Sequence, residues 1–178
     1  MKNAKKWIPL SLMGIIIILD QLVKTIVVQT WPSPSYNLRN IWDVFNNGFL
    51  WILHVRNKAI AFSLGAGLPE TVKTLLFIAV PLLVTVFLFW YFFRADDLTS
   101  LQRWTLAGII GGGLGNLIDR VFRPDGVVDF ISVNLYGLFG YDRWPTFNIA
   151  DSAVVVCVIL FLISMLVPVK KPAKETKQ

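Results

Sequence analysis

An almost unbroken apolar run extends from Val72 to Phe93 and reads VKTLLFIAVPLLVTVFLFWYFF. A helix that crosses the hydrocarbon core of a bilayer needs about 20 mostly apolar residues, so this run predicts a membrane span. Pro81 lies inside it and predicts a kink, which a helix packed in a membrane tolerates. Similar stretches lie at about residues 7–28, 102–121 and 147–167. We therefore expect an all-α membrane protein with four transmembrane helices.

The composition of the whole chain agrees with this class. Of its 178 residues, 16% are charged and 55% hydrophobic, whereas a soluble domain has about a quarter charged residues. The net charge of +6 comes from basic residues that flank the apolar runs. Anionic membrane lipids are therefore the expected partner, and nucleic acid is not. The length predicts a single domain over residues 1–178, with a disordered tail at about 170–178.

The first apolar run has a second interpretation, a cleavable signal peptide, since three lysines precede it. The run continues past Asp20 to Val28, however, and no small-x-small cleavage site follows. An uncleaved first span is therefore the better interpretation.

The orientation follows from the distribution of basic residues. An even number of spans places both termini on one side of the membrane, and lysines cluster at both ends of the chain. Arg94 and Arg103 border the short loop between the second and third spans. The positive-inside rule therefore predicts that the termini and this loop are cytoplasmic.

The two longer loops, at about residues 29–71 and 122–146, then face outward. Phe49–Val55 is rich in strand formers and follows an Asn-Asn-Gly turn signal, so we expect a small extracytoplasmic β element on the membrane. Val127–Ile131 is another short strand candidate. We expect a short interfacial helix over Tyr36–Phe45.

Polar side chains gather at the outer ends of the predicted spans. Charged residues are costly inside a bilayer, so each one is a candidate functional residue. The outer ends are the C-terminal ends of spans one and three and the N-terminal ends of spans two and four. The residues in this layer are Asp20 and Lys24 on the first span, Asn116, Asp119 and Arg120 on the third, Asn148 and Asp151 on the fourth, and Asn57 and Asp129 in the outer loops.

Each of the charged residues also has a purely structural interpretation. Asp20 and Lys24 are spaced i, i+4 and could form an ion pair that only helps helix packing. Asp119 and its neighbour Arg120 could only anchor the third span at the headgroups. Asp151 could be a first-turn residue favoured by the helix dipole, and Asp129 alone would be an ordinary loop aspartate.

Other conspicuous residues favour structural roles. The glycines at positions 111, 112, 113 and 115 predict a close helix-packing surface and not a phosphate loop. His54 is the only histidine, and without a second histidine or a neighbouring cysteine it does not indicate a metal site. Cys157, the only cysteine, lies in an apolar run and predicts an inert buried thiol.

A pair of aspartates remains as the candidate chemistry. Two carboxylates held close together share a proton, so one can accept a proton from water while the other polarises a carbonyl group. This is the chemistry of aspartic proteases, and it uses no metal and no cofactor. Spacing alone does not establish that Asp129 and Asp151 meet. Two other classes stay open: a proton-coupled transporter using Asp20, Asp119 and Asp151, and a non-enzymatic assembly subunit.

Five blocks of the sequence strongly resemble the lipoprotein signal peptidase (signal peptidase II) family, and together they cover about residues 10–165. The blocks are Asp20-Gln-Leu-Val-Lys24, Asn57-Lys-Ala-Ile-Ala-Phe62, Gly112-Gly-Leu-Gly-Asn116-Leu-Ile-Asp119-Arg120, Val127-Val-Asp129-Phe130 and Phe147-Asn148-Ile-Ala-Asp151-Ser152. The second block departs from the family pattern, because Ala59 and Ile60 replace the usual Gly-Ala. This change puts the local loop geometry in doubt but not the catalytic pair.

The resemblance implies an aspartic endopeptidase of the bacterial cytoplasmic membrane with its active site at the outer face. It implies removal of signal peptides from prolipoproteins, with cleavage N-terminal to a cysteine that already carries diacylglycerol, and inhibition by the cyclic peptide globomycin. Asp129 and Asp151 would be catalytic. The supporting residues would be Asp20, Lys24, Asn57, Asn116, Arg120 and Asn148. We expect a monomer whose partners are lipidated prolipoproteins and membrane lipids.

Overall fold

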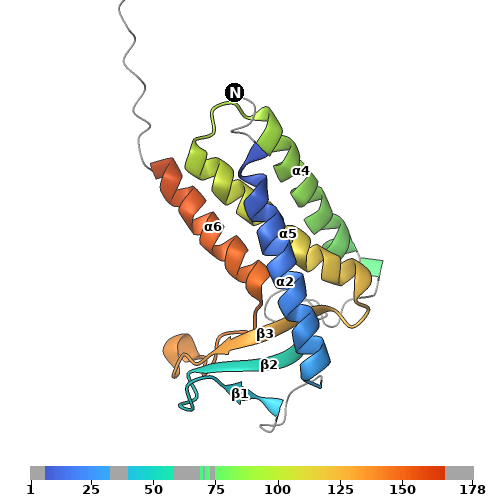
Figure 1. The fold of residues 1–178 in the computed structure, drawn as a ribbon, viewed down its shortest axis with the longest axis vertical. Coiled ribbons are helices and arrows are strands. Elements are labelled where there is room, and N and C mark those ends of the chain that lie inside the picture. Colours follow the sequence, from blue (N-terminus) through green and yellow to red (C-terminus); the bar gives the residue numbers. More distant parts are fainter. Residues whose placement is uncertain (1–6, 33–39, 58–68, 70, 73–74, 167–178) are drawn as a thin grey trace, which may run out of the picture.

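The computed structural model of the chain describes residues 7–32, 40–57, 69, 71–72 and 75–166. Within these residues, four long helices lie side by side and a small sheet lies at one end of them (Figure 1). The helices are α2 (Leu10–Thr30), α4 (Val80–Arg94), α5 (Ser100–Phe122) and α6 (Ile149–Leu166), and the strands are β1 (Trp42–Asp43), β2 (Leu50–Asn57) and β3 (Val127–Val133). The tail predicted to be disordered lies outside the described residues.

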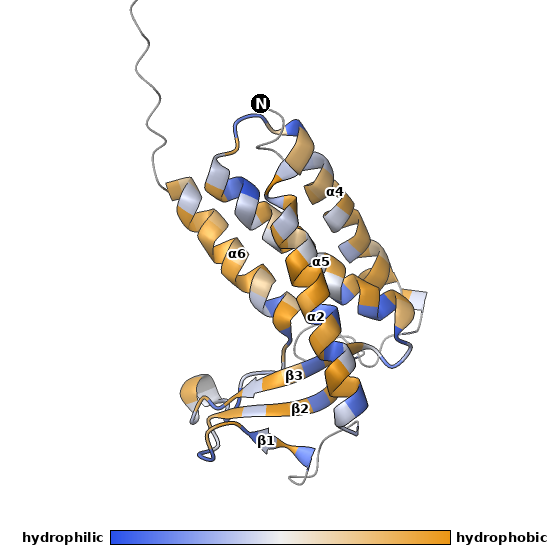
Figure 2. Ribbon diagram, in the orientation of Figure 1, coloured by the Kyte–Doolittle hydropathy of each residue, from blue (hydrophilic) through white to orange (hydrophobic). Residues whose placement is uncertain are grey.

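The helices consist largely of hydrophobic residues (Figure 2), and many of their large apolar side chains are exposed. Leu83 on α4 and Ile18 on α2 are 68% and 66% exposed, an arrangement that water would penalise and lipid would not. Among the described residues, three helices are long and apolar enough to cross a membrane: Leu10–Thr30, Leu75–Arg94 and Ile149–Leu166. These bounds lie within a few residues of the spans predicted at 7–28, 72–93 and 147–167. The chain is a multi-pass membrane protein.

The helix predicted at residues 102–121 is also present, as α5, but it is less apolar than the other three. It lies at the centre of the bundle and packs against α2, α4 and α6. The predicted glycine surface makes this packing possible. A Cβ atom at Gly112 would collide with the carbonyl oxygen of Ala150, and one at Gly111 would lie 3.0 Å from the carbonyl oxygen of Met13. The interpretation of these glycines as a close-packing surface is confirmed.

The turn between α4 and α5 is held by a buried arginine. Arg103 donates hydrogen bonds to the carbonyl oxygens of Phe92 (3.0 Å) and Ala95 (2.6 Å) at the C-terminal end of α4. These carbonyl groups have no partner within the helix, and a cation is favoured there. Thr99 and Gln102 form a capping box at the start of α5. The two helices therefore form a fixed antiparallel hairpin.

The small sheet confirms both predicted strand regions. Its order is β1-β2-β3, and both pairs of neighbours are antiparallel. The predicted turn precedes β2, with Asn46 and Gly48 at positive φ angles of 54° and 77°. In the pairing of β2 with β3, Val55 lies opposite Asp129 and Asn57 opposite Val127. This register brings Asn57, from the segment between α2 and α4, next to Asp129, from the segment between α5 and α6.

Two local predictions differ from the structure. The interfacial helix expected over Tyr36–Phe45 is wrong for Trp42 and Asp43, which form β1 because their backbones pair with Ile52 and Trp51. Residues 36–39 of that segment lie outside the described residues. Pro81 does not kink a continuous α-helix. It lies in the first turn of α4, directly after the π-helical turn η3 (Leu75–Ala79), where its missing N–H is tolerated.

Candidate active site

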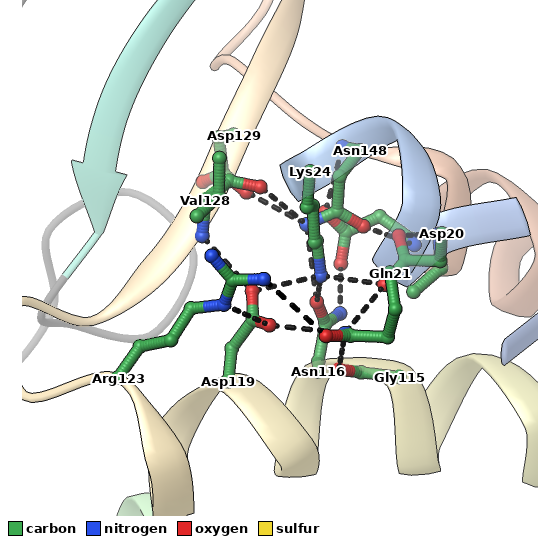
Figure 3. A network of polar contacts seen from close by, with 12 residues as sticks. Asp20, Gln21, Lys24, Gly115, Asn116, Asp119, Arg123, Val128, Asp129 and Asn148 are labelled. Atoms are coloured by element: carbon green, nitrogen blue, oxygen red, sulfur yellow. Dashed lines mark hydrogen bonds and ion pairs between the residues drawn. The ribbon is translucent and has the colours of Figure 1, made fainter. Parts of the chain in front are cut away.

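The polar residues expected to share one layer lie together at the end of the bundle that carries the sheet (Figure 3). They come from the C-terminal halves of α2 and α5, the start of α6 and the neighbouring strands. The centre of the network is buried: the exposed fraction is 0% for Asp20, Lys24, Asp119 and Asn148 and 3% for Asp129. Buried polar groups of this kind are stable only when each finds a partner.

Lys24 is the centre of the network. Its ammonium group contacts Asp20 Oδ2 at 2.7 Å and Asp119 Oδ2 at 3.0 Å, and it donates a hydrogen bond to Asn116 Oδ1 at 3.0 Å. An ammonium group has three protons, and these three acceptors match them. The i, i+4 pair predicted on α2 is therefore present, and it extends to two residues of α5.

Asn148 links the two aspartates. Its side-chain amide donates to Asp129 Oδ1 at 2.8 Å, and its side-chain oxygen accepts the backbone N–H of Asp151 at 2.9 Å. Each carboxyl group also accepts a hydrogen bond from another asparagine side chain: Asn57 donates to Asp129 Oδ2 at 3.0 Å, and Asn116 donates to Asp151 Oδ1 at 2.6 Å. The predicted polar residues thus surround both carboxyl groups.

The start of α6 fixes Asp151. Asp151 Oδ2 accepts the backbone N–H of Asn148 at 3.1 Å while Asn148 Oδ1 accepts that of Asp151, so the two side chains form a reciprocal cap on the helix. Asp20 Oδ1 accepts the next free backbone N–H, that of Ala150, at 2.9 Å. The first-turn position expected for Asp151 is confirmed, and the same contacts orient its carboxyl group.

The electrostatics of Asp129 differ from those of an ordinary loop aspartate. The pKa of Asp129 is raised from 3.8 to about 7: burial is the largest cause, the nearby Asp151 carboxyl adds to it, and the hydrogen bonds from Asn57 and Asn148 oppose the shift. Arg120 on α5 is half-buried and interacts electrostatically with Asp151 and Asp129. Asp129 therefore holds a proton at a pH where a free aspartate has lost it.

Comparison with known protein families agrees with this geometry. The family model described as Signal peptidase (SPase) II matches residues 12–167, a range that contains the whole network. The chain belongs to the signal peptidase II family. Membership makes it a peptidase and confirms the resemblance of the five sequence blocks. A proton-coupled transporter has no support from this family.

Individual relatives of this signal peptidase II chain agree. It is 43% identical to the lipoprotein signal peptidase of Treponema pallidum (strain Nichols) over 162 residues, 91% of this chain and 84% of the relative. It is 44% identical to that of Treponema denticola over 160 residues, 89% of each chain. A bacterial membrane enzyme solved by the in meso method at 2.3 Å resolution shares 30% identity and a TM-score of 0.72, covering 95% of this chain and 94% of its own.

Two members of the network in this signal peptidase II chain were not predicted. Gln21 donates to the carbonyl oxygen of Gly115 and to Asp119 Oδ1, both at 3.0 Å, and Arg123 Nε contacts the same Asp119 oxygen at 3.1 Å. The available signals were the place of Gln21 inside the first block and the i, i+4 spacing of Arg123 from Asp119. Asp119 Oδ2 also accepts the backbone N–H of Val128, so this aspartate fixes the start of β3.

His54 and Cys157, which were expected to be structural, lie outside the network. His54 is 2% exposed, and its Nδ1 contacts the carbonyl oxygen of Trp31 at 2.8 Å, which ties β2 to the end of α2. Cys157 is buried against Gly108 on α5. Ala59 and Ile60, the departure from the family block, lie outside the described residues.

We expect Asp20→Ala to destabilise this signal peptidase II chain by about 1–3 kcal/mol. The substitution leaves the N–H of Ala150 without its acceptor and removes one of the two carboxylates that neutralise Lys24. Thermal unfolding of the purified protein measures the effect, with Ser11→Ala, at the opposite end of α2, as the control. An unchanged melting temperature would contradict the prediction, and a stable but inactive Asp20→Asn protein would place Asp20 among the catalytic residues.

Proposed function

We propose that this protein is a membrane-embedded aspartic endopeptidase that removes signal peptides from diacylglyceryl-modified prolipoproteins. Cleavage is N-terminal to the lipidated cysteine, and Asp129 and Asp151 are the catalytic pair. The observation that carries the proposal is that Asn148 contacts both aspartates: its side-chain NH₂ donates to the buried Asp129 carboxyl group, and its backbone N–H donates to the carboxyl group of Asp151. The names of the relatives support the substrate class.

The arrangement suits acid–base hydrolysis. The pair holds one proton between its two carboxyl groups, so the ionised member takes a proton from water while the protonated member polarises the scissile carbonyl group. Asn57, Asn116 and Asn148 hold the carboxyl groups in place by donating to their oxygens. Arg120 interacts with both and stabilises negative charge near them. No cofactor takes part in the proposed reaction.

The proposed topology has four spans, with the termini in the cytoplasm and the active site at the outer face of a bacterial cytoplasmic membrane. α5 has 23 residues and is about 34 Å long, which matches the hydrocarbon thickness. Its polar residues are tolerated because they face other helices and not lipid. The terminal lysines support the orientation.

Reporter fusions test this topology. A cytoplasm-specific reporter fused after Gln178 should be active, and the same reporter inserted in the turn at Asn47, at the far end of the sheet, should be silent. A reporter specific for the outer compartment should give the reverse pattern. Signals from the same side at both positions would contradict a four-span arrangement.

Cleavage of a lipidated precursor by the purified protein tests the function itself. A diacylglyceryl-modified preprolipoprotein should lose its signal peptide and migrate faster on a gel, and mass spectrometry should place the new N-terminus at the lipidated cysteine. A purified, folded protein that does not cleave this substrate would contradict the proposed function. Cleavage within the signal peptide and not at the cysteine would contradict the proposed specificity.

The rate of cleavage should fall as the pH rises through about 7. The pKa of Asp129 is raised above its ordinary value of 3.8 to about 7, so the pair keeps its proton below that pH and loses it above. A second, acidic limb is expected where the pair gains another proton, which gives a bell-shaped profile. Rates should be measured across a pH series, with samples returned to neutral pH to show that activity recovers. A flat profile on the alkaline side would contradict the shared proton.

A further inference from the structure

The contacts of Asn116 reach from the ion cluster on α2 to the carboxyl group on α6. Its side-chain oxygen accepts hydrogen bonds from Lys24 Nζ and from Asn148 Nδ2, each at 3.0 Å. Its side-chain nitrogen donates to Asp151 Oδ1 at 2.6 Å. A single amide is therefore held between a buried cation and a candidate catalytic carboxyl group.

These partners permit only one orientation of the Asn116 amide. Turned over, its NH₂ group would face the Lys24 ammonium, which has no acceptor to offer, and its oxygen would face the Asp151 carboxyl group. Lys24 itself cannot turn away, because its other two protons are bound by Asp20 and Asp119. Lys24, together with the Asn148 amide that donates to the same oxygen, therefore holds Asn116 with a donor, and not an acceptor, toward Asp151.

The remaining contacts of Asp151 also match an ionised carboxylate. Asp151 Oδ2 accepts the backbone N–H of Asn148 at 3.1 Å, and the residue lies in the first turn of α6, where the helix dipole favours negative charge. Arg120 on α5 adds an attractive cation. Asp151 is also half-buried, so a charge on it keeps part of its contact with solvent.

Asp129 is the less favourable place for a charge. It is 3% exposed, and it lies on a strand, without the dipole of a helix start. The charged groups that act on it are Asp151 from α6, which opposes ionisation, and Lys24 from α2 and Arg120 from α5, which favour it. Asp129 and Asp151 each accept two N–H hydrogen bonds, so hydrogen bonding does not distinguish them. Burial of Asp129 and the position of Asp151 at the start of a helix make Asp151 the easier of the two to ionise.

We propose that Lys24 is a positioning residue of the reaction: by fixing the amide of Asn116, it keeps Asp151 ionised as the general base and leaves the shared proton on Asp129. This assignment rests on the proposed function and deepens it. Asp151 takes a proton from water as the water oxygen bonds to the scissile carbon, and Asp129 gives its proton to the carbonyl oxygen. When the C–N bond breaks, Asp151 gives its proton to the leaving nitrogen, and Asp129 regains one from the hydroxyl group that becomes the new carboxyl.

Infrared spectroscopy of the purified, full-length protein tests the location of the proton without turnover. A protonated carboxylic acid has a carbonyl band that a carboxylate lacks. In the wild type, such a band should disappear as the pH rises through the pKa of Asp129, which is well above the pH at which exposed carboxyl groups ionise. Asp129→Asn should remove it. Asp151→Asn should keep it at a lower midpoint, because burial, the larger cause of the shift, remains. Loss of the band in Asp151→Asn with survival in Asp129→Asn would overturn the assignment.

The role of Lys24 is tested in an Asp129→Asn background, where Asp151 is the remaining carboxyl group of the pair. Lys24→Met should make an acid band appear, because the Asn116 oxygen then loses its charged donor, keeps only the weaker hydrogen bond from the Asn148 amide, and can turn toward Asp151. In Lys24→Met, Asp20 and Asp119 also lose their cation, so one of them could be the source of the new band. Adding Asp151→Asn should remove the band if it belongs to Asp151. Asn116→Leu should produce the same band while Lys24 keeps both of its ion pairs, and this variant serves if Lys24→Met does not fold.

Activity separates this inference from the proposed function. In the otherwise wild-type protein, Lys24→Met and Asn116→Leu should each lower kcat by about 10²-fold or more and shift the alkaline limb of the pH profile, whereas Ser11→Ala should change neither. Asp151 remaining ionised in both infrared variants would overturn the role of Lys24 even if the wild type cleaves its substrate. A wild type that shows the predicted bands but cleaves no lipidated precursor would contradict the function and leave the proton assignment standing.

Discussion

Asp129→Asn and Asp151→Asn should each lower kcat for a lipidated precursor by at least about 10³-fold. Asparagine keeps the size of the side chain and some of its hydrogen bonds, but it cannot hold the shared proton or accept one from water. Because the two carboxyl groups act as one unit, the double variant should lose little more than either single variant. The measurement is the single-turnover rate of signal-peptide release by folded protein in detergent or lipid.

Asp125→Asn is the matched control for this experiment. Asp125 is exposed in the turn just before β3, only four residues from Asp129, so the same chemical change is made beside the site and not in it. Its rate should stay close to that of the wild type. Substantial turnover by a folded Asp129→Asn or Asp151→Asn protein would end the two-aspartate mechanism.

An unlipidated precursor should be cleaved with a kcat/KM at least about 10²-fold lower than that of the diacylglyceryl form. Each CH₂ group buried in the bilayer contributes about 0.8 kcal/mol, so two acyl chains dominate the binding of the precursor. We expect the acyl chains to stay in lipid beside α2, α4 and α6, whose exposed side chains are largely apolar, while the peptide reaches the end of the bundle. The loss should lie mainly in KM, because the acyl chains contribute equally before and during the reaction.

A precursor with a single acyl chain separates the lipid from other features of the cysteine. Its KM should fall between the values for the unlipidated and the diacylglyceryl substrates, with kcat little changed. Measurements at fixed lipid-to-protein ratio are needed, since partitioning into the membrane determines the local substrate concentration. Equal kcat/KM for all three substrates would show that the enzyme recognises the peptide alone.

Much of the helical architecture could be predicted because a bilayer imposes a minimum length and an apolar surface. The spans beginning near Trp7, Val72 and Phe147 all correspond to helices with similar bounds. The central helix α5 has a weaker apolar signal, because it packs mainly against other helices and its residues need not be compatible with lipid. The β1 strand could not be predicted, since two residues have no periodicity and pair only because β2 lies beside them.

The layer of the site could be predicted, but the pairings within it could not. Topology alone brings the outer ends of the spans together, and this was enough to group Asp20, Asn116 and Asp151. Which donor pairs with which acceptor depends on the directions of the side chains, and these cannot be read from the spacing of residues in the sequence. For that reason Gln21 and Arg123, both ordinary by sequence, were missed although they contact Asp119.

The long-range contacts of the network have a consequence for biogenesis. The carboxylate of Asp20 receives the N–H of Ala150, a residue 130 positions later, and Asp151 enters the network only when α6 is in place. In the proposed mechanism the pair of carboxyl groups is therefore complete only after the last helix, α6, has packed against α2 and α5. We expect a chain truncated before α6 to have no peptidase activity even if its first helices have entered the membrane.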